Sequence, residues 1–338
     1  MSEPVFGPIP SRRLGRSLGV DPIPLKTCNW NCVYCQLGRT HKLINERAEY
    51  VPTEEILSAV RTALEENKGG IDTVTFVGSG EPTLHSKLGE MVRRVKEMTE
   101  IRVAVITNGS LLYLPEVREE LMAADIVMPT LDAAEETLYR KLNRPHPKLT
   151  LPTLINGIKS FRKEFGGLVW LEVMLVSGMN DTEEALRALA NVLQEIDPHE
   201  IHLHYPSRPP AEGWIEPYDP EGTMRALAIL GDKAKFLTPL PKELEPKLAG
   251  DPLEVIPSLV QRHPLMEADF CRLMETRPAE EVKGALRQLS QEGKIRSIER
   301  FGKQFWTGIG PSYAGLKQAP TPSSPRRCVG SPGTTNEN

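Results

Sequence analysis

The chain has 338 residues with an apolar fraction of 39%, which is enough for one large α/β domain and a smaller second unit. Its formal net charge of −4 argues against a chain that binds polyanions over its whole surface, although a local basic face is compatible with it. The sequence shows no apolar run of membrane-spanning length and no signal-peptide pattern, so we expect no membrane span, no export and a cytoplasmic location.

The opening segment is rich in turn residues and basic side chains, and it leads into a predicted strand at 17–21. Its arginines, Arg12, Arg13 and Arg16, have two interpretations. They could face an anionic substrate, but arginines near a terminus more often lie on a solvated edge. The sequence therefore favours the solvated edge.

Three of the five cysteines, Cys28, Cys32 and Cys35, lie close together directly after this strand. The spacing places their sulfurs on one side of a helix or around one centre in a loop. Thiolate ligands select zinc, cuprous copper or iron–sulfur clusters. A cluster with three protein thiolates would leave one iron open to a substrate or cofactor. Alternatively, His41 would close a zinc site, or the thiols would be buried and reduced without a metal.

A regular alternation of strands and helices follows, beginning with a helix for which Thr53 is the expected N-cap. With the opening strand, the predicted strands are 17–21, 71–77, 101–106, 125–131, 168–176 and 200–205. Strands and helices at this spacing predict parallel strands joined by right-handed crossovers, either in a doubly wound sheet or in a barrel.

Glycine and polar residues cluster where the second, third and fourth of these strands end, and ligands of parallel α/β folds bind at that edge. The residues are Gly78, Ser79, Gly80, Glu81, Thr107, Asn108 and Asp132. The glycines would let a ligand approach the backbone closely. The polar side chains serve either as ligand contacts or as turn and helix caps.

The C-x3-C-x2-C spacing of Cys28, Cys32 and Cys35, with the aromatic Tyr34 before the last cysteine, resembles the signature of the radical S-adenosylmethionine (radical SAM) enzymes. The resemblance implies that the three cysteines hold a [4Fe-4S] cluster, that SAM binds its fourth iron, and that Tyr34 lies near the adenine. It also implies reductive cleavage of SAM to methionine and a 5′-deoxyadenosyl radical, which abstracts hydrogen from a substrate. An electron donor of the ferredoxin or flavodoxin type would be needed.

The glycine turn resembles the GGEP element of the same family, which contacts the SAM amino group, with Ser79 in place of its first glycine. At the same edge, Thr107 and Asn108 are expected SAM contacts, and Asp132 is an expected acceptor for ribose hydroxyls. The resemblance implies an α/β fold with a partial (β/α)6 TIM-like barrel over residues 1–236, and the count of predicted strands agrees with it.

Several residues near the last predicted strands are also candidates. Glu172 lies between apolar neighbours and needs a ligand amine or an arginine opposite it. His202 and His204 share a strand face, but two histidines without a third ligand are more often polar lining. Arg208 lies in a stiff Arg-Pro-Pro turn that could hold it over a substrate anion.

Residues 4–215 resemble a radical SAM group related to wyosine synthase, a tRNA-modifying enzyme. Wyosine synthases carry further cysteines for a second cluster ahead of the radical SAM motif. This chain has no cysteine before Cys28, so we do not expect wyosine formation.

The C-terminal part has a different composition. Residues 237–252 are rich in proline and charge and are a predicted linker. Predicted helices at 253–262, 267–274 and 278–292 precede a hairpin, a pattern that resembles a winged-helix domain over 253–310. Such a unit binds either nucleic acid or protein. Residues 311–338 are expected to be a disordered tail.

The leading hypothesis is thus a radical SAM enzyme whose substrate is an RNA base or a peptide, delivered partly by the winged helix. The alternative is a non-enzymatic iron–sulfur or zinc regulator with the winged helix as reader and the cysteine loop as sensor. A glycine turn at the edge that carries the cysteines favours the enzyme, because a sensor has no need of a SAM site.

Overall fold

The computed structural model describes residues 4–217, 219–237, 248 and 250–315. It has an α/β fold built on a mostly parallel, eight-stranded sheet whose strands neighbour one another in sequence order. The strands are β1 (Val5–Ser11), β2 (Gly15–Val20), β3 (Thr73–Phe76), β4 (Arg102–Thr107), β5 (Ile126–Pro129), β6 (Leu168–Met174), β7 (Glu200–His204) and β8 (Ala234–Phe236). Only β1 and β2 pair in antiparallel fashion.

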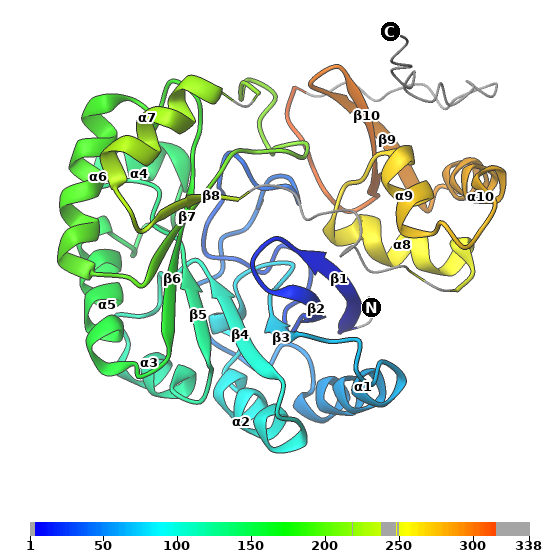
Figure 1. Ribbon diagram of the computed structural model, residues 1–338, viewed down its shortest axis with the longest axis horizontal. Helices are drawn as coiled ribbons and strands as arrows, with labels where there is room; N and C mark the ends of the chain where they lie inside the picture. Colours follow the sequence, from blue (N-terminus) through cyan, green and yellow to red (C-terminus); the bar gives the residue numbers. More distant parts are fainter. Residues whose placement is uncertain (1–3, 218, 238–247, 249, 316–338) are drawn as a thin grey trace, which may run out of the picture.

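Helices connect the parallel strands and lie on the outer face of the curved sheet (Figure 1). They are α1 (Thr53–Glu66), α2 (Leu88–Met98), α3 (Pro115–Leu121), α4 (Glu136–Leu142), α5 (Leu151–Glu164), α6 (Glu183–Ile196) and α7 (Pro220–Leu230). Along β6, alternate residues such as Val169, Leu171 and Val173 are fully buried in the core shared with these helices. The other side chains of the strand, including Glu172, are left on the inner face.

The sheet has two more strands than the six that the sequence predicts. The added strands are β1, in the turn-rich opening, and the short β8. Proline and glycine hide β1 in the sequence, since both residues are depleted in strands. Thr53 also differs from its expected role: it is the first residue of α1, and its hydroxyl donates to Glu49 at 2.7 Å.

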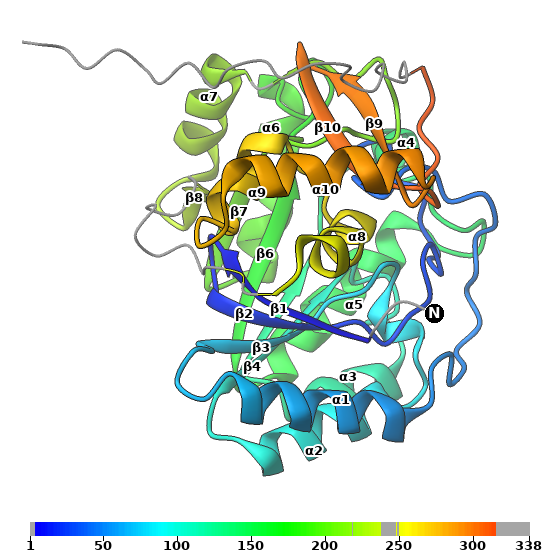
Figure 2. The same cartoon turned by 90° about the vertical axis from the view of Figure 1, so that its right-hand side faces the viewer.

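The sheet curls so that its first hairpin meets its far edge. In the turn between β1 and β2, Arg12 donates to the carbonyl oxygen of Leu237 just beyond β8, at 3.1 Å. The neighbouring Arg13 forms an ion pair with Glu172 on β6. In Figure 2, β1 and β2 lie in front of β6, which runs behind them in this view. This curvature is consistent with a partial TIM-like barrel and makes the inner face a shared interior.

A second, smaller unit follows with a core of its own, which includes Phe270 and Trp306. It consists of α8 (Pro252–Arg262), α9 (Glu267–Leu273), α10 (Ala279–Gln291), β9 (Ile295–Arg300) and β10 (Lys303–Gly308). The hairpin turns at Phe301 and Gly302, which both have positive φ angles, as tight hairpin turns require. The three helices and the hairpin occur where the sequence predicts them.

Residues 311–315 differ from the expected disordered tail. Ser312 forms a bridge to Gly38, and Ala314 forms one to Glu212. The hydroxyl of Tyr313 donates to the carbonyl oxygen of Gln36 at 2.6 Å. The chain after the hairpin therefore packs against the cysteine loop. Most of the predicted linker, at 238–247 and 249, and the rest of the tail lie outside the described residues.

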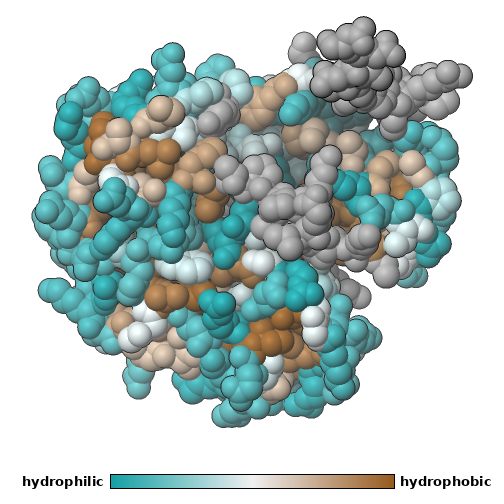
Figure 3. Space-filling view, viewed as in Figure 1, coloured by the Kyte–Doolittle hydropathy of each residue, from teal (hydrophilic) through white to brown (hydrophobic). Residues whose placement is uncertain are grey.

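Hydrophilic side chains cover most of the face seen in Figure 3, and apolar side chains appear there only in separate patches. Among the described residues, no helix is both long and apolar enough to span a membrane.

Candidate active site at the carboxyl ends of the strands

Cys28, Cys32 and Cys35 lie in the long loop between β2 and α1, and not on a helix. All three are half-buried free thiols. Tight turns shape the loop: the amide of Cys35 donates to the carbonyl of Cys32 at 3.2 Å, and the amide of Gly38 donates to that of Cys35 at 3.0 Å. Of the two geometries that the spacing leaves open, the structure therefore has the loop.

The charges of the three thiols act on one another. Burial raises the pKa of Cys28 to about 12, with smaller contributions from Glu81 and Cys35. Burial also raises the pKa of Cys32, and the charges of Cys28 and Cys35 add to this. Burial lowers the pKa of Lys26, but the thiolates outweigh it and the net shift is upward. The Nζ of Lys26 lies 3.3 Å from the sulfur of Cys35.

This arrangement suits a cluster better than a single ion. In the described part of the chain, no group of three or more His, Cys, Asp or Glu side chains could hold a metal ion. A zinc ion needs its sulfur ligands about 2.3 Å from one point, and His41 is exposed. A [4Fe-4S] cluster takes one thiolate on each of three different irons and accepts ligands that are farther apart. Metal binding would also release the protons that burial keeps on the thiols.

The glycine turn is bonded directly to the cysteine loop. The amide of Lys26 donates to the carbonyl of Ser79 at 2.7 Å, and the amide of Glu81 donates to that of Thr27 at 2.9 Å. A Cβ built on Gly80 would overlap the carbonyl oxygen of Thr27. Gly80 is therefore required for the close approach of the two segments.

Ser79, which replaces a glycine of the GGEP pattern, has its side chain turned to Asp21. Its hydroxyl donates to one carboxylate oxygen at 2.6 Å, and its amide donates to the other at 2.9 Å. Both residues are buried. The serine thus anchors the turn to the end of β2, a function that glycine could supply only through its amide.

The buried carboxylate of Glu81 binds the turn that follows β4. It accepts hydrogen bonds from the hydroxyl of Thr107 at 2.5 Å and from the amide of Asn108 at 2.7 Å. Thr83 contributes its amide and hydroxyl as further donors. Asn108 in turn donates to Asn29 of the cysteine loop at 2.7 Å. Burial raises the pKa of Glu81, although these donors oppose the shift. The structure therefore brings Glu81, Thr107 and Asn108 together.

Tyr34 and Asp132 meet on the other side of the loop. The hydroxyl of Tyr34 donates to Asp132, and Asn143 donates to the same carboxylate oxygen at 2.6 Å. The amide of Met174 donates to its second oxygen at 2.8 Å. Burial raises the pKa of Asp132 to about 6. The Asp132 carboxylate is thus held by donors from the protein itself, and one of them is Tyr34 of the cysteine loop.

Asn143 is a site residue that the sequence did not reveal. It is completely buried at the C-terminus of α4, and its side chain lies 3.8 Å from the sulfur of Cys32. Its carbonyl oxygen accepts the amide of Asn31 at 3.0 Å. An asparagine at a helix end usually serves as a cap, so its position in the sequence gives no sign of these contacts.

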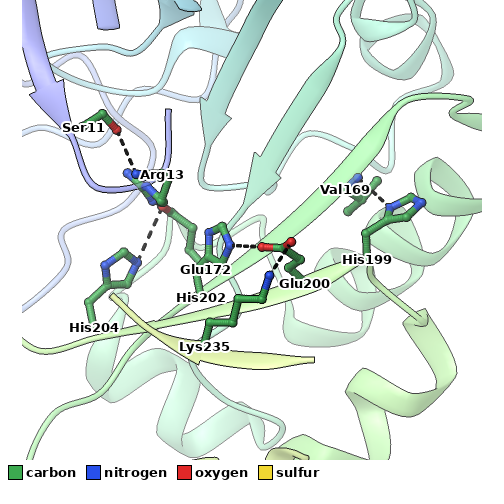
Figure 4. Close-up of polar contacts among 9 residues, drawn as sticks. All are labelled: Ser11, Arg13, Val169, Glu172, His199, Glu200, His202, His204 and Lys235. Atoms are coloured by element: carbon green, nitrogen blue, oxygen red, sulfur yellow. Dashed lines mark hydrogen bonds and ion pairs between the residues drawn. The ribbon is translucent and has the colours of Figure 1, made fainter. Parts of the chain in front are cut away.

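Figure 4 shows the inner face of β6 and β7 beside the first hairpin. Glu172 has the arginine partner that its burial required, and this partner is Arg13. His204 lies 3.6 Å from the same carboxylate. His202 bonds to Glu200 at 2.8 Å, as polar lining and not as a metal ligand. The expectation that Arg13 lies on a solvated edge is wrong, because the curl of the sheet carries its turn into the interior.

Arg208 follows β7 and points back to the cysteine loop. Its side chain is half-buried, and one guanidinium nitrogen donates to the side-chain oxygen of Gln36 at 3.0 Å. Gln36 directly follows Cys35 and also donates to the carbonyl of Arg262 at 3.0 Å. Arg208 is thus brought next to the cysteine loop.

Comparisons with known proteins agree with this geometry. Residues 23–190 match the family model described as the Radical SAM superfamily, so the fold and the cysteine loop define a radical SAM enzyme. Enzymes of this class use a [4Fe-4S] cluster and S-adenosylmethionine, and they typically need an electron donor. The non-enzymatic regulator is therefore not the class that the comparisons support.

The chain belongs to the UPF0026 family. It is 34% identical to a UPF0026 protein of Methanocaldococcus jannaschii over 307 residues, which cover 89% of this chain and 94% of that protein. It is 38% identical to a UPF0026 protein of Synechocystis over 206 residues, 61% of this chain and 76% of that protein.

Two further similarities are limited in what they show. A Brachyspira hyodysenteriae protein named GTPase Obg is 43% identical over 199 residues, 59% of this chain, but the match spans only 29% of that protein. A radical SAM methyltransferase from Sphaerobacter thermophilus superposes with a TM-score of 0.52 at 20% identity, covering 65% of this chain and 66% of that one. The second similarity shows a shared fold alone.

Proposed function

We propose that Cys28, Cys32 and Cys35 ligate one [4Fe-4S] cluster, and that the chain acts on a hydrogen-bearing substrate. When bound, the cluster and SAM supply the reductive cleavage that yields methionine and a 5′-deoxyadenosyl radical, which abstracts hydrogen from the substrate. The convergence of three thiols in one loop, bonded to the glycine turn, carries this proposal. A ferredoxin or flavodoxin is the proposed electron donor.

The residues around the loop then divide into two groups. Ser79, Glu81, Thr107 and Asp132 have side chains engaged by the protein, so we assign them to positioning. The backbone of the glycine turn is available to a ligand: among the described residues, no hydrogen bond engages the amide or carbonyl groups of Gly78 and Gly80. We assign these groups to the SAM amino acid moiety, and the ring of Tyr34 to the adenine.

Asn108 and the neighbouring turn complete the proposed SAM site. The Asn108 side chain holds Asn29 and so fixes the start of the cysteine loop. Together with Asn143 beside Cys32, it restrains the loop from two sides. Such restraint positions the thiolates before the cluster binds. In a cofactor-based reaction the protein contributes this positioning, while the cofactor supplies the chemistry.

Anaerobic reconstitution with iron and sulfide, followed by dithionite and SAM, tests the proposal. We expect a brown chromophore and 5′-deoxyadenosine detectable by chromatography. Cys32→Ala should lose both, whereas Cys271→Ala, which removes a thiol of the C-terminal unit outside the cysteine loop, should retain both. Zinc in place of iron in the oxygen-free protein, or a cluster without any cleavage of SAM, would contradict the proposal.

We also propose that residues 253–310 are a winged-helix domain that contacts a nucleic-acid substrate. Three helices and a hairpin support this assignment. Lys283 and Lys294 are paired with Glu280 and Glu292, and Arg296 donates to the carbonyl oxygen of Pro311. Arg287, Arg300 and Lys303 form no ion pair among the described residues, so we assign them to phosphate contact. Lys303→Glu should weaken binding of an RNA hairpin and reduce its salt dependence, measured by fluorescence anisotropy at two salt concentrations. Binding that is equal in both proteins would exclude this surface.

A further inference from the structure

Arginines from two distant parts of the chain lie near the carboxyl ends of β6 to β8. Arg12 and Arg13 come from the turn between β1 and β2, and Arg208 comes from the loop after β7. Arg12 reaches the carbonyl of Leu237 beyond β8, and Arg13 reaches Glu172 on β6. The closing of the sheet by its first hairpin creates this meeting, which the sequence alone does not reveal.

Arg12 contributes to the pKa shifts of Arg13, Arg208 and His204. Burial lowers the pKa of Arg208 to about 10, and the charge of Arg12 is the next cause. Burial lowers the pKa of Arg13 to about 9, again with Arg12 as the next cause. The pKa of His204 falls well below its ordinary value through burial and then through Arg13 and Arg12. His204 therefore faces both arginines as a neutral ring.

Among the described residues, only one of these arginines has an acidic partner. Glu172 pairs with Arg13. Within the described residues, Arg12 and Arg208 form no ion pair, and their hydrogen bonds go to the neutral oxygens of Leu237 and Gln36.

The other groups near Arg208 do not supply the missing charge. Asp269 raises the pKa of Arg208 through its charge, but its carboxylate accepts hydrogen bonds from the amide of Met266 and from Arg272. His263, which also faces Arg208, is neutral because burial lowers its pKa to about 3. Guanidinium groups do not lose their protons in proteins. Within the part of the chain that the structure describes, these two positive charges therefore have no ion-pair partner.

We propose that Arg12 and Arg208, supported by Arg13 and His204, form a binding site for a phosphate group of the substrate. A guanidinium presents a planar fork of donors that matches phosphate oxygens. Two unbalanced cations match a phosphate monoester, which carries a charge of about −1.5 to −2 at neutral pH. Arg12 is exposed and Arg208 half-buried, so an entering group can reach both.

The location of this site suggests which end of the substrate binds there. Its assignment as a substrate site rests on the proposed function. Arg208 bonds to Gln36, the residue after Cys35, so the phosphate would be held beside the cysteine loop. The substrate would thereby be oriented with its phosphate on β6 to β8 and its reacting carbon toward the loop. This favours a phosphorylated substrate, such as a nucleotide unit, over an uncharged peptide.

Isothermal titration of the anaerobically reconstituted full chain with inorganic phosphate tests the site. We expect saturable binding that weakens by about tenfold or more in Arg12→Gln and in Arg208→Gln, because each loses charge-assisted hydrogen bonds. Arg16→Gln is the matched control: it lies in the same segment but pairs with Asp72 at the surface. Its affinity should stay within about twofold of the unmodified chain. Adenosine monophosphate and glucose 6-phosphate, titrated separately, distinguish a nucleotide from a sugar phosphate, and tighter binding of either supports the site.

Equal phosphate affinity in the double variant Arg12→Gln/Arg208→Gln and in the unmodified chain would overturn the proposal. Stronger binding of acetate than of phosphate would overturn the assignment to phosphate. SAM cleavage is measured separately in the same samples by 5′-deoxyadenosine release. Phosphate binding without SAM cleavage would contradict the proposed enzymatic function and support the phosphate site. SAM cleavage without phosphate binding would support the enzymatic function and overturn the phosphate site.

Discussion

Asp21 and Arg262 form a buried ion pair, with 2.9 Å between the carboxylate oxygen and Nε, that joins the end of β2 to the last residue of α8. The same carboxylate accepts the hydroxyl and amide of Ser79. The C-terminal unit is thus bonded to the glycine turn through one side chain. It is also bonded to the cysteine loop through Gln36. The two units are thus joined by polar contacts and not merely linked in sequence.

The Asp21 carboxylate is expected to be essential for stability. Asp21→Ala removes the carboxylate that pairs with the buried Arg262 side chain and frees the Ser79 turn, so we expect a loss of about 3–5 kcal/mol in the free energy of unfolding. Urea denaturation of the cluster-free protein measures it. Asp72→Ala, which breaks the exposed pair with Arg16, is the control and should have a small effect. Similar losses in both variants would contradict the bridging function of Asp21.

Gly80 is expected to be indispensable for cluster incorporation. In Gly80→Ala the added methyl group would overlap the carbonyl of Thr27, so the glycine turn must move away from the cysteine loop. We expect iron content after anaerobic reconstitution to fall severalfold. Gly166→Ala is the matched control, since a Cβ there meets nothing within 4 Å. A Gly80→Ala protein with full iron content would contradict this prediction, because it would show that the cluster binds even when the glycine turn moves away from the cysteine loop.

Glu81 is expected to act as a positioning residue for SAM. Glu81→Gln places an amide among the donors of Thr83, Thr107 and Asn108, which leaves buried donors unsatisfied. We expect a loss of about 1–3 kcal/mol in stability, together with a raised KM for SAM. Urea denaturation and SAM-cleavage kinetics measure the two effects. Glu55→Gln on the exposed face of α1 serves as control. Behaviour of Glu81→Gln like this control would argue against the assignment.

His202 predicts a specific pH dependence. Burial lowers its pKa from 6.5 to about 4. A histidine with a lowered folded-state pKa stabilises the fold above pH 6.5, and this contribution is lost as the pH falls toward 4. Between pH 7.5 and 5, the unmodified chain should therefore lose about 2 kcal/mol more stability than His202→Gln.

Urea denaturation across this pH range measures the His202 contribution. His41→Gln is the control because His41 is exposed, and its profile should follow that of the unmodified chain. Parallel profiles for His202→Gln and the unmodified chain would show that His202 is not held neutral by burial.

The sequence by itself determined the class of fold and the cluster motif. Cys28, Cys32 and Cys35 are local in sequence, so their spacing already restricts the chemistry of three thiols. The alternation of strands and helices is a local periodicity as well, and it placed Gly80, Glu81 and Asn108 at one edge. These features depend on neighbours along the chain, which a sequence displays directly.

Only the tertiary structure decided how distant segments complete the site. The pairing of Arg13 with Glu172 and the hydrogen bond from Arg12 to Leu237 depend on the curl of the sheet, which no local pattern encodes. The bridge from Asp21 to Arg262 joins residues 241 positions apart. Burial and charge balance follow from which surfaces meet, so an arginine that looks solvated in sequence can become part of a buried, positively charged interior.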